Sequence, residues 1–112
     1  MNIQHKNLAS GSWGKLSLAE QLANVGSELE RTISWRERDN LEYSKKAFER
    51  MLELLTLTKI SCKKKSELKE IARVYELLVD YFKGENKFKS TDELWKNYFA
   101  NFTYLASQKR SV

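Results

Sequence analysis

Hydrophobic residues recur at helical spacing along most of the chain and predict four helices. Ser17 and Glu20 have the S-x-x-E form of a capping box, and the apolar residues that follow keep to one narrow face, which predicts a helix over 18–38. Wider apolar stripes predict three further helices, over 41–59, from Ser66 to just before Gly84, and over 91–107.

Polar residues mark the boundaries between these stripes. Asp39 and Asn40 can end one helix and cap the next, and Gly84 is placed as the residue after a helix end. Ser90 and Glu93 repeat the S-x-x-E pattern before the last helix. A glycine inside a helix costs about 1 kcal/mol relative to alanine. We therefore expect Gly26 to lie where two helices approach closely.

The chain has no proline and only four glycines, which is typical of long helices rather than of tight-turned sheets. Helices joined by short loops are usually antiparallel neighbours. We therefore predict an all-α, up-down-up-down four-helix bundle over 17–112, preceded by a flexible, polar N-terminal arm over 1–16. Trp13 is the exception in this arm. It can pack back on the bundle as an anchor or serve as a linear motif for a partner, and we favour the anchor.

Composition is that of an ordinary soluble domain, with 41% hydrophobic and 31% charged residues. No apolar run is long enough to span a bilayer, and the first sixteen residues contain no apolar segment of the kind found in secretory signals. A single cysteine fits a reducing compartment. We therefore expect a cytoplasmic protein.

Motifs for catalysis or cofactor binding are absent from the sequence. There is no glycine-rich phosphate loop, and His5 and Cys62 are the only residues of their kinds, too few for a usual zinc site. A di-iron site in a bundle needs Glu-x-x-His on two helices, and the predicted helices contain no histidine. We expect no enzymatic activity, no metal and no cofactor.

Basic residues collect at one predicted end of the bundle. The formal net charge is +5, and the connection 59–66 alone carries four lysines and no acid. In an up-down bundle this connection shares one end with the start of the first helix and the end of the last. The residues placed there are Lys15, Lys59, Lys63, Lys64, Lys65, Lys69, Lys109 and Arg110. Such an end can contact nucleic-acid phosphates, or it can simply keep the protein soluble.

Apolar residues exceed what one simple bundle buries. The segment LWKNYFANFTY (94–104) places four of its five rings on a single stripe and leaves Tyr104 outside it. The stripes of the second and third helices are wider than one inward face. The surplus residues, predicted as a partner interface, are Ala47, Leu54, Val74, Leu77, Tyr81 and Tyr104. The alternative is that these two helices lie more centrally than a simple bundle allows.

The sequence resembles a group of short bacterial proteins over nearly the whole chain. Three stretches carry the resemblance: SLAEQLANVGSELERTISWRERDN, AFERMLELLTLT and STDELWKNYFANF. This resemblance implies a bacterial, cytoplasmic, helical protein. The size and helix count are also similar to those of HEPN-type helical bundles. Their RNase members carry an arginine followed by a histidine, whereas His5 has no arginine before it, so the likeness implies a non-catalytic relative.

Two functions follow from these observations, and an enzyme of unrecognised type, such as a nuclease that uses scattered carboxylates, stays open as a third. The first is a small interaction module that self-associates or docks on a partner protein through the surplus apolar residues. The alternative is a nucleic-acid-binding accessory protein that uses the lysine-rich end.

Overall fold

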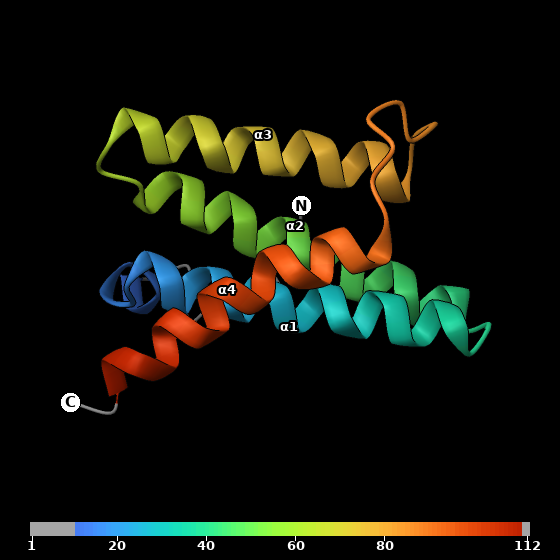
Figure 1. Ribbon diagram of the computed structural model, residues 1–112, viewed down its shortest axis with the longest axis horizontal. Coiled ribbons are helices and arrows are strands. Elements are labelled where there is room, and N and C mark those ends of the chain that lie inside the picture. Colours follow the sequence, from blue (N-terminus) through green and yellow to red (C-terminus); the bar gives the residue numbers. More distant parts are fainter. Residues whose placement is uncertain (1–10, 111–112) are drawn as a thin grey trace.

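The computed structural model describes residues 11–110, without the side chains of Lys109 and Arg110, and this part of the chain contains helices and no strand. A short 3-10 helix, η2 (Trp13–Lys15), precedes four α-helices. These are α1 (Leu18–Glu37), α2 (Leu41–Ser61), α3 (Lys65–Phe82) and α4 (Asp92–Arg110). They pack as a four-helix bundle in which α4 crosses α1 (Figure 1). The predicted fold class is confirmed.

Local capping explains where the helices begin. Ser17 Oγ accepts a hydrogen bond from the Glu20 amide at 3.1 Å, and Glu20 Oε1 accepts one from the Ser17 amide at 3.0 Å, so the predicted capping box forms. Asn40 caps α2 by accepting a bond from the Tyr43 amide.

Several of the predicted boundaries shift by one to three residues, and α4 ends three residues later than predicted, at Arg110. The cap of α4 is Thr91, whose hydroxyl accepts the Leu94 amide, and not Ser90 as predicted. Helix α2 continues to Ser61, two residues beyond its predicted end.

Helix α1 is the central element of the core. Its Leu22, Val25, Leu29 and Ile33 are buried along one face. Gly26 lies against Phe99 of α4, where a side chain would clash, so the expected role of this glycine in a close helix approach is confirmed.

The segment before α1 is part of the folded domain. Trp13 is only 2% exposed, and its Nε1 donates a hydrogen bond to Thr58 Oγ1 of α2 at 3.1 Å. Gln21 Nε2 donates to the Trp13 carbonyl at 2.9 Å. Trp13 is therefore an anchor, as favoured. The flexible arm predicted over 1–16 is wrong for 13–16, and its first ten residues lie outside the described part.

The predicted partner interface is largely internal. Ala47, Leu54 and Val74 are buried, and Leu77 and Tyr81 are half-buried against the core. Only Tyr104, at 63% exposure, has the expected exposed side chain. The interface as predicted, on the outer faces of α2 and α3, is therefore wrong for its buried members.

Helix α4 explains this burial. Glu70, Val74, Leu77 and Tyr81 follow one ridge of α3 at spacings of three and four residues. Both ends of the ridge bond to α4, where Glu70 accepts the Tyr98 hydroxyl and Asp92 accepts the Tyr81 hydroxyl. The apolar residues between them face α4, which covers the surplus on α3.

None of the helices within residues 11–110 is long and apolar enough to cross a lipid bilayer.

Candidate functional site

The structure brings the predicted basic segments to one end of the bundle. The α2–α3 connection, η2 with the start of α1, and the last turns of α4 lie at the same end of the molecule (Figure 1). We call the six described lysines at this end the lysine pole, which comprises Lys15, Lys59, Lys63, Lys64, Lys65 and Lys69. Lys109 and Arg110 belong to the last turn of α4, but their side chains lie outside the described part.

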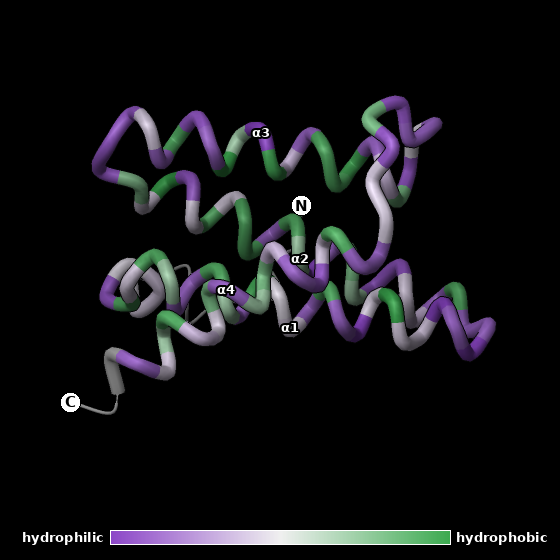
Figure 2. Tube along the Cα trace, in the orientation of Figure 1, coloured by the Kyte–Doolittle hydropathy of each residue, from purple (hydrophilic) through white to green (hydrophobic). Residues whose placement is uncertain are grey.

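The six lysines are exposed and carry uncompensated charge. All have exposed side chains, and no ion pair of the described residues involves them. Two of the nearby carboxylates have other partners, since Glu20 accepts the Ser17 amide and Glu70 accepts the Tyr98 hydroxyl, and Glu67 is the third carboxylate at this end. The trace through the α2–α3 connection is hydrophilic (Figure 2). This end therefore presents a positive surface to solvent.

A shallow pocket of about 290 Å³ lies at the base of the pole. It is lined by Gly14, Leu16, Leu18, Gln21, Ser61, Cys62, Lys63, Lys64 and Glu67. Lys64 is the N-cap of α3 and provides no side-chain cap, so the positive end of this helix dipole adds to the charge of the lysines.

Cys62 lines this pocket, and its surroundings disfavour the thiolate form. Burial, followed by the nearby Glu67 and Glu70 carboxylates, raises the pKa of Cys62 above its ordinary value. Nucleophilic chemistry needs the thiolate. His5, the one histidine that could pair with this cysteine in nucleophilic catalysis, falls outside the described residues.

The buried or paired ionisable groups elsewhere hold helices together. Glu28 of α1 bonds Arg31 at 2.7 Å and Arg50 of α2 at 3.2 Å. Burial raises the pKa of Asp92, but hydrogen bonds from Arg36 and Tyr81 outweigh it and hold that pKa below its ordinary value. In both clusters the charged side chains already bond to partners on another helix. Such contacts stabilise the fold.

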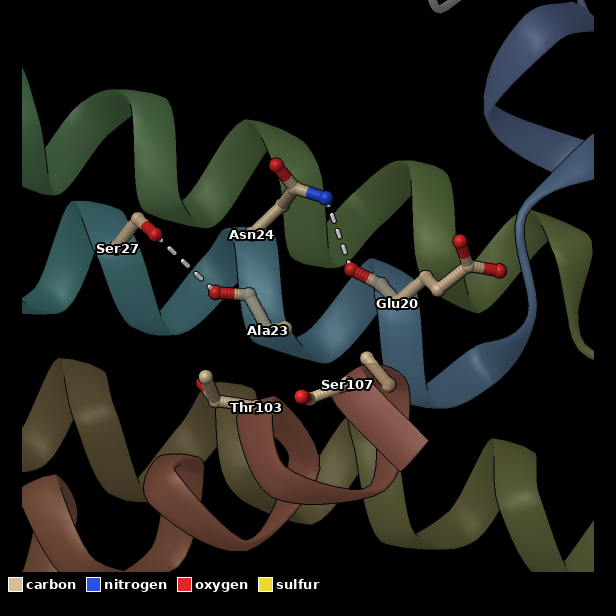
Figure 3. Close-up of a pocket in the computed structure, with 7 residues that line it drawn as sticks. Glu20, Ala23, Asn24, Ser27, Thr103 and Ser107 are labelled. Carbon is tan, nitrogen blue, oxygen red and sulfur yellow. Dashed lines mark hydrogen bonds between the residues drawn. The ribbon is translucent and has the colours of Figure 1, made fainter. Parts of the chain in front are cut away.

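A second pocket of about 290 Å³ runs between α1 and α4 and offers little chemistry. Figure 3 shows Glu20, Asn24 and Ser27 on one wall, with Thr103 and Ser107 on the other. Asn24 Nδ2 donates to the Glu20 carbonyl and Ser27 Oγ donates to the Ala23 carbonyl, so these polar groups bond to their own helix. Across residues 11–110 no group of three or more His, Cys, Asp or Glu is placed to hold a metal ion.

The α3–α4 connection contains one exposed aromatic contact that no sequence pattern predicted. Phe88 is 57% exposed, and the guanidinium carbon of Arg73 lies 5.3 Å from its ring centroid. The available signal was the aromatic residue between Lys87 and Lys89. The contact also needs Arg73, which lies fifteen residues earlier in the sequence.

Comparisons with known proteins found no relative of this chain. No protein-family model, curated protein or solved structure gives a significant match to the chain.

Proposed function

We propose that this protein is a non-catalytic helical module that binds the phosphate backbone of a nucleic acid through the lysine pole. One observation carries the proposal: six exposed lysines gather at one end of the bundle without an ion-pair partner among the described residues. The proposal places the protein in the cytoplasm and assigns it no metal or cofactor.

Physical chemistry favours an anionic partner at such a surface. Lysines that neutralise phosphates release condensed counterions, and this release makes binding favourable and strongly dependent on salt. Lysine contacts carry little sequence information, so we expect affinity for the backbone without base specificity from the pole itself.

Charge reversal at the pole tests the proposal against a matched control. Lys64 and Lys65 are replaced by glutamate in one variant, and Lys45 and Lys46, an adjacent exposed pair on α2, in the other. Both variants change the net charge equally. Fluorescence anisotropy with labelled oligonucleotides should lose binding in the first variant and retain most of it in the second. Equal losses in both, or no binding by the unaltered protein, would contradict the proposal.

A second candidate function is self-association through α4. Leu94 and Leu105 are 51% and 48% exposed, and eleven residues of α-helix return them to the same face. Exposed apolar rows often mark association sites. Light scattering should then detect a dimer that becomes a monomer when both leucines are replaced by serine, whereas Leu41→Ser, at another exposed leucine, should not change it. A monomer at high concentration would exclude this candidate.

A further inference from the structure

Four hydrogen bonds between side chains and backbone hold the connection between α3 and α4, although it lies at the surface. Asp80 accepts two amides of this loop, from Lys87 at 2.9 Å and from Phe88 at 3.2 Å. Asn86 bonds Ser90 in both directions, accepting its amide at 2.8 Å and donating to its carbonyl at 3.0 Å. The loop therefore presents its side chains in one arrangement before any partner binds, which lowers the entropy lost on binding.

Phe88 is the aromatic residue that this loop presents. Its ring is 57% exposed, and the Arg73 guanidinium lies over it at 5.3 Å. The side chains of Lys87 and Lys89 on either side are exposed. A half-exposed phenylalanine contributes little packing to its own fold. With a cation beside it, the ring can stack on a flat, electron-rich group while the cation contacts a neighbouring anion.

A basic ridge leads from the lysine pole to this ring. Lys65, Lys69 and Arg73 recur every four residues along α3, so they lie on one ridge and rise about 6 Å from each to the next. All three side chains are exposed. The helix runs from the α2–α3 connection at one end to the loop of Phe88 at the other (Figure 1).

The carboxylates near the ridge oppose its charge only in part. Asp80 accepts the two loop amides and keeps its charge, and Glu76 and Glu85 are exposed, whereas Glu67 and Glu70 lie on other sides of α3. Against them stand the three cations of the ridge and the two loop lysines beside Phe88. The strip from Lys65 to Phe88, which we call the α3 strip, therefore keeps a positive balance.

We propose that the α3 strip binds single-stranded nucleic acid, with phosphates along Lys65, Lys69 and Arg73 and one unpaired base stacked on the exposed ring of Phe88. This inference rests on the proposed function and specifies that the protein binds single strands rather than duplexes. In a duplex the bases are paired and stacked on one another, so none can reach a ring at the protein surface, whereas single strands are bound by combining basic grooves with aromatic platforms. The same chemistry serves RNA and DNA.

The test measures affinity for single strands and duplexes by fluorescence anisotropy, in RNA and DNA arms, with polyphosphate as a base-free competitor. Base–aromatic stacking predicts that Phe88→Ala weakens single-strand binding about 5-fold or more. Phe88→Trp should retain it. Tyr104→Ala, which removes a ring of similar exposure from α4, should not change it. Polyphosphate affinity should stay the same in all three variants.

The outcomes separate the two proposals. If the unaltered protein binds single strands but Phe88→Ala binds them equally well, or if duplexes bind as tightly as single strands, the α3 strip is wrong and the lysine pole stands. If neither nucleic acid nor polyphosphate binds, the proposed function itself fails. If Phe88→Ala weakens polyphosphate binding and single-strand binding equally, the loss of affinity comes from altered charge or folding. That result would also overturn the stacking contact.

Discussion

Gly26 in α1 lies so close to Phe99 in α4 that a Cβ on the glycine would stand 2.8 Å from the Cβ of the phenylalanine. Non-bonded carbon atoms do not stand this close without strain, and the Phe99 Cβ is attached directly to its backbone, so relief requires the two helices to separate. The contact fixes how closely α4 crosses α1, and it thereby sets the position from which α4 covers the apolar ridge of α3.

Gly26→Ala should therefore destabilise the protein. Overpacking costs about 1–3 kcal/mol, and the gain in helix propensity offsets about 1 kcal/mol of it. We expect the free energy of unfolding in urea to fall by about 1 kcal/mol. Gly14→Ala is the control, because its Cβ would meet nothing nearer than Ser61 Oγ at 3.9 Å. A Gly26→Ala variant as stable as the unaltered protein would contradict the close approach.

The Trp13–Thr58 hydrogen bond predicts that the domain needs residues before α1. Trp13→Ala should lower the free energy of unfolding by about 3–5 kcal/mol, as truncation of a buried tryptophan does. Thr58→Val keeps the shape but leaves the indole Nε1 without its acceptor, and it should cost about 1–3 kcal/mol. Urea denaturation measures both. A chain that begins at Ser17 and unfolds at the same urea concentration as the full chain would refute the anchoring role.

The contact between Asp92 and its partners Arg36 and Tyr81 predicts a loss of stability in acid. The pKa of Asp92 is lower in the folded protein than its ordinary value of about 3.9. The stabilisation is therefore fully present above about pH 4 and is lost as the pH falls through the folded pKa. Because the groups are partly exposed, we expect at most about 1 kcal/mol.

Unfolding of Asp92→Asn at pH 7 and at pH 3 tests this expectation. The variant should be less stable than the unaltered protein at pH 7, and the difference should shrink at pH 3. Glu93→Gln, at an exposed carboxylate one residue along, should show no comparable convergence. A difference that is the same at both pH values would mean that Asp92 does not stabilise the fold through its charge.

The helices could be predicted because their signals are local. The Ser17–Glu20 capping box, the spacing of Leu22, Val25 and Leu29, and the polar residues at Asn40 each act within a few positions of the chain. The shared end of the lysine pole also followed from the alternation of helix direction. The likeness to HEPN-type bundles stays a prediction.

The pairing of apolar surfaces could not be predicted in the same way. Val74 is buried because Tyr98 and Asp92 of α4 bond to the same ridge of α3, and nothing near Val74 in the sequence specifies that neighbour. Likewise Phe88 gains its place from Arg73 and Asp80, which lie one helix back along the chain. Both features depend on contacts between distant segments, so a helical wheel drawn for one helix does not contain them.

The salt dependence of single-strand binding tests the central claim most directly. For single strands, the slope of log affinity against log salt concentration is about −0.7 for each phosphate neutralised. Replacing Lys64 and Lys65 by glutamine should reduce the magnitude of that slope by about 1.4. Replacing Lys45 and Lys46 in the same way should not change it. The same slope in the unaltered protein and in the Lys64 and Lys65 variant would show that the lysine pole does not contact the nucleic acid.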